Sequence, residues 1–263
     1  MSEGEDKLRW DHPAAAHVGI VNREDARIDW RGRRKFAVVG FASSTRDRAP
    51  YDDPEWVICG LNQLYRHIPR ADLWFDIHED FNEPGTVVPG TDFLGWLKAC
   101  PIPIVMTRQF EDVPNCVRYP IERIIEKFGI DYFTSSISLM IAFAISEGFT
   151  HVGVWGVDLI VGQEWDYQKA CAEFWLGQAM GRGIEVVLPD KSALLKTLYR
   201  YGYEKEPGQG FLKLSMLEGK RGRMAKEREE LLKRLYCIDG AIQENDHWRE
   251  LFLLRMRGGA VGE

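Results

Sequence analysis

Residues 133–158 constrain the fold most strongly, because they read as a buried helix that runs directly into a buried strand. Residues 137–145 are apolar on nearly every face, which is typical of a helix enclosed in a core. Residues 151–156 carry two valines and a tryptophan and predict a strand covered on both sides, as in a parallel sheet. A helix-then-strand unit of this kind predicts an α/β fold.

Polar residues stand at both ends of this unit. Three hydroxyl residues begin the helix, where backbone N–H groups have no partner inside the helix: Thr134, Ser135 and Ser136. Such a helix end can bind an anion. Asp158 follows the strand, and ligands of open α/β sheets bind at the carboxyl ends of the strands. The sequence therefore predicts one polar site above a buried core.

The rest of the chain repeats the alternation of strands and helices. Strands are expected near residues 36, 56, 71, 102, 151 and 184, which predicts a Rossmann-like, mostly parallel sheet with helices on both faces over residues 34–205. Residues 1–33 lack a clear period and predict a mobile or loosely docked arm. Residues 206–263 predict a C-terminal helical tail.

Composition limits the classes of function. A net charge of −6 argues against a chain built mainly to coat nucleic acid, so contact with nucleic acid is only weakly supported. No apolar run approaches the roughly 20 residues that span a bilayer, and the polar start lacks the apolar core of a signal peptide. We expect a cytoplasmic protein without membrane contact. The five scattered cysteines predict reduced packing residues rather than a metal site.

The loop after the first strand has the parts of a nucleotide-binding loop. Gly40 allows close approach of the backbone to a ligand, and Ser43 and Ser44 supply hydroxyl groups. The loop matches neither of the common glycine-rich phosphate motifs, so a plain turn is an equal alternative. After the second strand, Asn62 can cap a helix or hydrogen-bond a ribose or base.

Ionisable residues cluster after the third predicted strand. His78 lies between Asp76 and Asp80, and histidine titrates near neutral pH. Asp76 and His78 stand two residues apart, which resembles a loose D-x-D metal motif. We expect Asp76 and Asp80 as ligands of Mg²⁺ or Mn²⁺; a solvated loop is the alternative. In the predicted helix 169–180, Glu173 reads either as an acid or base facing the site or as a first-turn glutamate favoured by the helix dipole.

The tail is a different kind of sequence. Residues 217–256 predict one long charged helix, with seven basic and four acidic residues between Glu218 and Arg234. An apolar stripe at helical spacing follows, and it contains Leu231, Leu232, Leu235, Ile238 and Ile242. Such a stripe must be covered, either by the rest of the chain or by a second subunit. One way to cover the stripe is a homo-oligomer that forms through the C-terminal helices.

Short segments spread over residues 36–200 resemble the bacterial CMP-sialic-acid-dependent sialyltransferases. They are residues 59–65 (CGLNQLY), residues 134–136 with Met140 and Gly148, and residues 155–158, 172–174, 184–186, 189 and 192–195. The same core with a helical tail is also similar to uncharacterised proteins of tailed phages, for which the cytoplasm would be that of the host. The resemblance implies a Rossmann-like transferase with a nucleotide-sugar donor.

The resemblance also implies where the nucleotide would bind. Carried over by position, its contacts are Gly40, Ser43 or Ser44, Asn62, and Ser135 or Ser136. Phe41 replaces the asparagine of the family's first glycine loop, and the family's general-base histidine has no counterpart near Gln163. The base would then have to be His78, Asp158 or Glu173.

Three functions remain open on the sequence. The first is a glycosyltransferase-like enzyme whose acceptor is a hydroxyl of a glycan or of a modified DNA base. The second is an ATP- and Mg²⁺-dependent diphosphotransferase similar to the pterin pyrophosphokinases, with Asp76, Asp80 or Asp158 at the metal. The third is a non-catalytic nucleotide-binding or assembly protein that acts through its tail helices. The expected ligand in each case is a small molecule that contains a nucleotide.

Overall fold

The computed structural model describes residues 10–78, 91–159, 164–197, 199–204 and 214–258. The chain divides into two units, Met1–Lys196 and Thr197–Glu263. Each unit is described by itself below.

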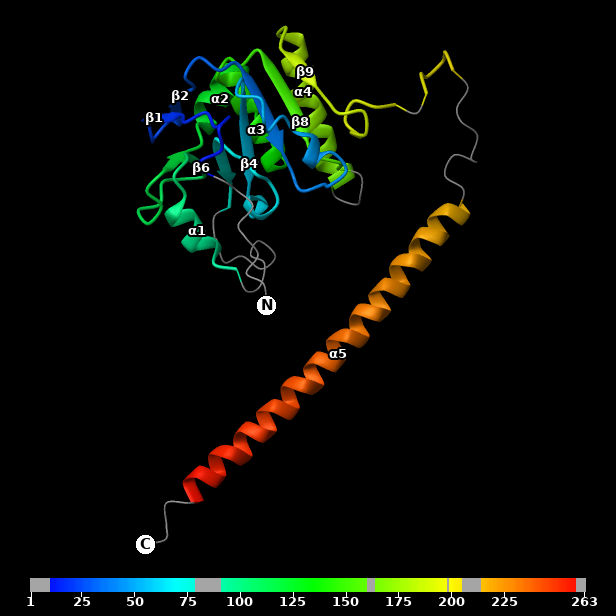
Figure 1. Cartoon of the computed structure of the whole chain (residues 1–263). Helices are drawn as coiled ribbons and strands as arrows, with labels where there is room; N and C mark the ends of the chain where they lie inside the picture. The colour runs from blue at the N-terminus through cyan, green and yellow to red at the C-terminus, as the bar shows by residue number, and fades with distance from the viewer. Residues whose placement is uncertain (1–9, 79–90, 160–163, 198, 205–213, 259–263) are drawn as a thin grey trace. The chain divides into compact units, whose positions relative to one another are not determined.

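A seven-stranded sheet forms the centre of the first unit (Figure 1). Its strands are β3 (Lys35–Val39), β4 (Trp56–Leu61), β5 (Leu73–Asp76), β6 (Ile104–Met106), β7 (Cys116–Arg118), β8 (His151–Trp155) and β9 (Glu185–Val187). The spatial order is β7-β6-β5-β4-β3-β8-β9, and all neighbouring pairs are parallel. The predicted Rossmann-like fold is confirmed. The strand order reverses at β3, so the carboxyl ends of β3 and β8 form the topological switch point.

Helices cover both faces of this sheet. They are α1 (Phe93–Ala99), α2 (Ile121–Phe128), α3 (Ser136–Ser146) and α4 (Ala170–Gly181). Trp74 and Phe75 are successive residues of β5, so their side chains point to opposite faces. The Trp74 ring packs on Trp96 of α1 with centroids 4.9 Å apart, and the Phe75 ring packs on Phe143 of α3 at 5.6 Å. Helices α2 and α4 both pack against α3.

Helix α3 lies in the middle of the core, as its apolar sequence predicts. From Ile137 to Ser146 only Leu139 is not fully buried. After the helix, Gly148 adopts a φ of 78°, a left-handed conformation that glycine takes without a steric cost. This turn sends the chain into β8 beside β3, and so places residues 156–159 at the switch point.

Residues 10–33 are docked on the first unit, whereas the sequence predicts a mobile or loosely docked arm. Strands β1 (Gly19–Asn22) and β2 (Arg27–Asp29) form an antiparallel pair. Ala16, Ala26 and Ile28 are buried. Trp30 packs edge-on against Phe149, with ring centroids 5.0 Å apart. The sequence gives little sign of this docking, because short side chains and backbone groups make most of it.

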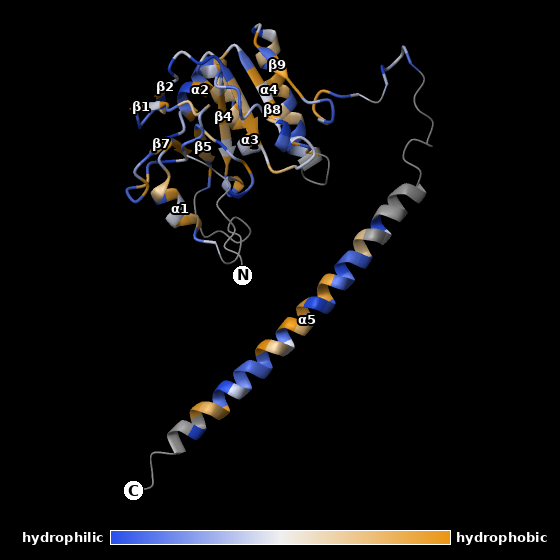
Figure 2. Ribbon diagram, in the orientation of Figure 1, coloured by the Kyte–Doolittle hydropathy of each residue, from blue (hydrophilic) through white to orange (hydrophobic). Residues whose placement is uncertain are grey.

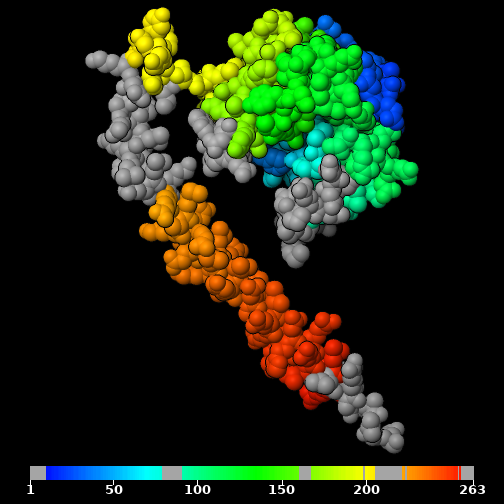
Figure 3. All heavy atoms as spheres, turned by 180° about the vertical axis from the view of Figure 1, so that it is seen from behind, coloured from blue at the N-terminus to red at the C-terminus, as the bar shows by residue number. Residues whose placement is uncertain are grey.

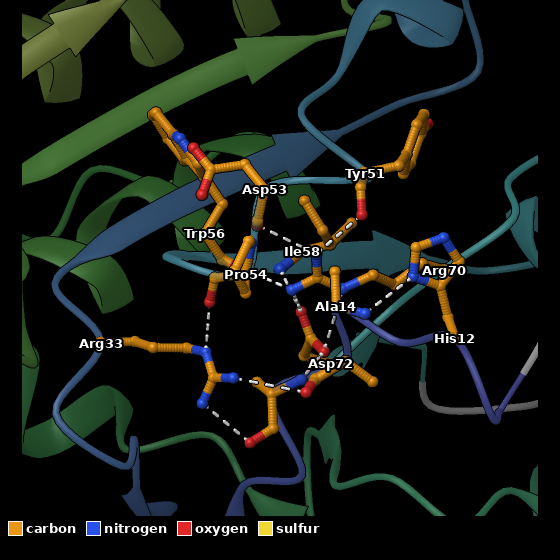
Figure 4. Close-up of polar contacts among 12 residues, drawn as sticks. His12, Ala14, Arg33, Tyr51, Asp53, Pro54, Trp56, Ile58, Arg70 and Asp72 are labelled. Carbon is orange, nitrogen blue, oxygen red and sulfur yellow. Dashed lines mark hydrogen bonds and ion pairs between the residues drawn. The ribbon is translucent and has the colours of Figure 1, made fainter.

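A buried ion pair holds this N-terminal segment to the sheet (Figure 4). Arg70 and Asp72 are both fully buried, and Arg70 Nη2 lies 2.9 Å from Asp72 Oδ2. Asp72 also accepts hydrogen bonds from the backbone N–H groups of Ala16 (2.5 Å) and Ile58 (2.7 Å). Arg70 donates to the carbonyl oxygen of Tyr51 at 2.8 Å. The pair therefore joins the N-terminal segment, β4 and the loop before β4.

The remaining elements are shorter, apart from the tail. Single turns lie at Arg46–Arg48 and Leu64–Arg66, and a π-helical segment, Glu164–Lys169, precedes α4. Residues 189–197 and 199–201 contain no helix.

The second unit contains the helix α5 (Leu214–Gly258), which runs for 45 residues as one rod (Figure 3). Among its described side chains, nine large apolar ones between Leu231 and Leu253 are exposed, and Met224 is exposed as well. Within the described ranges no helix combines the length and the apolar run that crossing a membrane requires.

Candidate functional site

A cleft of about 410 Å³ opens at the carboxyl ends of β3, β4 and β8. Its lining comprises Gly40, Phe41, Ala42, Leu61, Asn62, Ser135, Ser136, Ile137, Gly156, Val157, Asp158, Leu159 and Gln168. This volume is in the range of small-molecule sites. The cleft lies at the switch point of the sheet, where open α/β folds bind their ligands.

Two glycines form the floor of the cleft. Gly40 N–H donates to the carbonyl oxygen of Trp155 at 2.8 Å, and Ala42 N–H donates to that of Gly156 at 2.8 Å. A Cβ atom on Gly40 would lie 2.5 Å from Gly156 O, and one on Gly156 would lie 2.3 Å from Gly40 O. Gly40 therefore allows the backbone just after β8 to approach closely.

The start of α3 forms one wall. Ser135 caps the helix, because its Oγ accepts from Ser138 N–H at 3.4 Å and Ser138 Oγ donates to the Ser135 carbonyl at 2.7 Å. The next two backbone N–H groups, of Ser136 and Ile137, have no partner among the described residues, and both residues line the cleft. N–H groups without a partner at the positive end of a helix can bind an anion, and α3 is 11 residues long.

Asp158 is the one charged residue among the described residues of the lining. Ser44 Oγ lies 2.8 Å and 3.0 Å from the two carboxylate oxygens of Asp158, so the hydroxyl donates to this group and holds it in place. Ser43 is exposed and lies outside the lining. An anion close to Asp158 would be repelled unless a cation bound between the two groups.

Asn62 combines an unusual backbone with a buried acceptor. Its φ is 50°, in the left-handed region that asparagine tolerates better than most residues. Its N–H donates to Phe75 O at 2.9 Å, and its carbonyl accepts from Trp74 Nε1 at 3.0 Å. Its Oδ1 is buried and has no partner among the described residues. Asn62 does not cap the turn at Leu64–Arg66. The N-cap residue of that turn is Gln63, and its side chain makes no capping hydrogen bond. A ligand donor would satisfy Oδ1.

Asp76 and His78 form a pair at the end of β5, beside β4. Asp76 is fully buried, and its Oδ1 lies 2.5 Å from His78 Nδ1, while the His78 side chain is 23% exposed. The second oxygen, Asp76 Oδ2, has no partner among the described residues. A carboxylate on Nδ1 fixes the orientation of the ring. Neither residue lines the cleft, but neighbouring strands are only about 4.8 Å apart.

The predicted metal site is only partly visible. Asp80 lies outside the described residues, so its position relative to Asp76 stays a prediction. Among the residues that the structure describes, no group of three or more His, Cys, Asp or Glu side chains is arranged to hold a metal ion.

Glu173 lies away from the other predicted residues. Its Oε1 accepts from Leu195 N–H at 2.7 Å and lies 3.7 Å from Lys169 Nζ. It is absent from the cleft lining. The Glu173 carboxylate therefore joins the segment after β9 to α4, with a side chain that is 29% exposed.

Phe41 and Gln168 line the cleft but do not stand out in the sequence as candidates. The Phe41 side chain is 45% exposed, and an exposed aromatic ring at a cleft can stack on a base. The sequence could have indicated Phe41 by its position directly after Gly40, because an apolar ring in the loop after a strand lies outside the core. Gln168 carries no comparable signal, since its place depends on the π-helical segment before α4.

A scan against protein-family models found no match, and neither did searches of the curated proteins and of the solved structures. The fold and the site define the class: a Rossmann-like α/β protein with a cleft at the switch point of its sheet and a long C-terminal helix.

Proposed function

We propose that this protein is a glycosyltransferase-like enzyme that binds a nucleotide-sugar donor in the switch-point cleft. The observation that carries the proposal is the start of α3, where Ser136 and Ile137 line a cleft of about 410 Å³ and their N–H groups have no partner among the described residues. Phosphate is the group that such a helix end binds best. The sequence resemblance to sialyltransferases supports the same assignment.

The other lining residues suit the remaining parts of a nucleotide. Asn62 Oδ1 is a buried acceptor that a base amine or ribose hydroxyl would satisfy. The exposed ring of Phe41 offers a surface for stacking. Asp158, held by Ser44, would accept hydrogen bonds from sugar hydroxyls, or bind a divalent cation that bridges to the phosphates. The described lining contains no basic side chain, and the positive end of the α3 dipole would attract the phosphate instead.

Transfer to an acceptor hydroxyl requires a general base. The Asp76–His78 pair supplies one by its geometry, because a buried carboxylate orients an imidazole that is itself partly exposed. An acceptor bound above β5 would lie next to β4, whose carboxyl end lines the cleft. Asp158 is the alternative base within the cleft. Glu173 is not part of this proposal, because its carboxylate is bonded to Leu195 N–H.

A non-catalytic nucleotide-binding or assembly protein is the second candidate, and the exposed apolar residues of α5 favour it. The diphosphotransferase reading has less support. Catalysis with ATP and Mg²⁺ needs carboxylates at the phosphates, and Asp158 is the single carboxylate in the described lining.

A thermal-shift panel tests nucleotide binding. It contains CMP, UDP, GDP, ATP, UDP-glucose and CMP-sialic acid, each with and without Mg²⁺ or Mn²⁺. We expect one nucleotide family to raise the unfolding midpoint, since a ligand at a hundred times its Kd adds about 2.7 kcal/mol to the stability. If none of these ligands shifts the midpoint, the proposal is wrong.

Turnover then separates an enzyme from a binding protein. With the donor identified, release of free nucleotide is measured for the parent and for His78→Gln. We expect His78→Gln to keep the ligand-induced shift and to lose about 10²- to 10⁴-fold in rate, the usual range for a general base. Binding without any turnover, over a panel of glycan and DNA acceptors, would favour the assembly protein instead.

A further inference from the structure

Apolar residues recur along α5 at alternating steps of three and four residues. Figure 2 shows hydrophobic residues recurring between hydrophilic ones along the helix. The register contains Arg221, Met224, Arg228, Leu231, Leu235, Ile238, Ile242, Asn245, Arg249 and Phe252. Its six apolar members are each between 49% and 64% exposed. A 3-4 repeat puts one stripe on one side of a helix, which is the seam of a coiled coil.

The polar members of this stripe decide how two copies of the helix can pair. In a parallel pair in register, Arg228 would face Arg228 and Arg249 would face Arg249, so the seam would contain like charges without partners. In an antiparallel pair centred between Tyr236 and Cys237, no arginine faces an arginine. The facing residues are then Leu235 with Ile238, Leu231 with Ile242, Arg228 with Asn245, Met224 with Arg249 and Arg221 with Phe252.

The charge along the helix gives the same orientation independently. Residues 218–234 contain seven basic and four acidic residues, whereas residues 239–255 contain two basic and four acidic ones. The antiparallel pair sets these two ranges against each other, so a basic half meets an acidic half. A parallel pair would set the basic half against itself. Complementary charge selects the partner orientation in such assemblies.

The antiparallel register also uses nearly the whole helix. Its centre falls at the middle of Leu214–Gly258, so the two helices would overlap almost end to end. We propose that α5 binds α5 of a second copy of this chain as an antiparallel coiled coil. This proposal is independent of what the cleft binds.

The mass of the full-length chain in solution tests the pairing. At tens of micromolar we expect light scattering to give twice the chain mass of 30.3 kDa. Leu235→Glu with Ile238→Glu should give a monomer, because these residues face each other at the centre. Tyr236→Glu is the matched control: Tyr236 is 68% exposed and lies off the stripe, so this variant should stay dimeric. A monomeric parent, or a dimer that survives the double substitution, would overturn the proposal.

A distance between two spin labels tests the orientation. Cys237 is the exposed cysteine, so the label is placed at Glu250→Cys in a Cys237→Ser chain. In the antiparallel pair residue 250 lies level with residue 223 of the partner helix, which separates the labels by about 40 Å along the axis. In a parallel pair both labels lie at one level on axes about 10 Å apart, and the separation falls to the order of 20 Å. A separation of the order of 20 Å would contradict the proposal.

Discussion

Asp72 shows how much one buried residue can hold together. Its carboxylate accepts from Arg70, Ala16 N–H and Ile58 N–H, and no part of it reaches solvent. Asp72→Asn keeps the size but removes the charge, which leaves the Arg70 guanidinium buried without its counter-ion. We expect a loss of about 3–5 kcal/mol in the free energy of unfolding, measured by urea denaturation.

An exposed ion pair is the control for this substitution. Arg31 and Asp29 lie 3.2 Å apart, and their side chains are 61% and 52% exposed. Asp29→Asn should change the stability by less than about 1 kcal/mol, because water screens such pairs. Equal effects of the two substitutions would show that the Arg70–Asp72 pair does not anchor the N-terminal segment.

The cysteines should differ sharply in reactivity. Burial raises the pKa of the Cys100 thiol to about 12, and burial also raises the pKa of Cys59 and Cys116. At pH 8 these thiols stay protonated, and the thiolate is the reactive form. Cys237 is exposed on α5. We expect DTNB to label Cys237 rapidly and the other cysteines only after unfolding. Rapid labelling of several thiols in the folded chain would contradict this.

At the scale of elements, the junction of β3 and β8 sets the shape of the cleft. We expect Gly40→Ala to cost about 1–3 kcal/mol, because the new Cβ would lie 2.5 Å from the Gly156 carbonyl oxygen. Gly177→Ala is the control of opposite sign. It lies in α4 with no atom within 4 Å of the new Cβ, and should stabilise the chain by about 0.5–1 kcal/mol. Unfolding midpoints of both variants decide; a neutral Gly40→Ala would mean that the junction is looser than described.

The elements that could be predicted are those with a strong apolar pattern. Helix α3 and strand β8 follow from one continuous apolar stretch, and their burial matches it. The β1–β2 pair and β7 were missed for a physical reason. Each is at most four residues long, and contacts with distant parts of the chain, such as Arg118 N–H with Arg23 O, fix it in place.

The candidate site could be predicted in part for the same kind of reason. Asn62, Ser136 and Asp158 follow strands or begin a helix, and parallel topology brings such positions to one edge. Glu173 stands in the first turn of α4, where a residue of the site could equally stand. Only the contact with Leu195, 22 residues further along the chain, shows its structural task.

At the scale of the whole molecule, the first unit has a core of its own. The buried apolar cluster runs from Ala26 to Leu194 and includes none of the α5 residues whose burial is described. We therefore expect a chain that ends at Glu204 to keep its unfolding midpoint and its nucleotide-induced shift, and to lose the dimer. Loss of nucleotide binding on this truncation would mean that the second unit contributes to the site.

Substitutions of Ser136 test the proposal that the start of α3 binds the phosphate of a nucleotide. Titration calorimetry is run with the nucleotide that stabilises the parent chain, on the parent, Ser136→Asp and Ser136→Asn. Aspartate favours the first turn of a helix but repels phosphate. We expect Ser136→Asp to unfold no earlier than the parent yet to bind the nucleotide at least about tenfold more weakly, equivalent to about 1.4 kcal/mol, while Ser136→Asn stays within about threefold of the parent. Equal affinity of all three chains would contradict the claim.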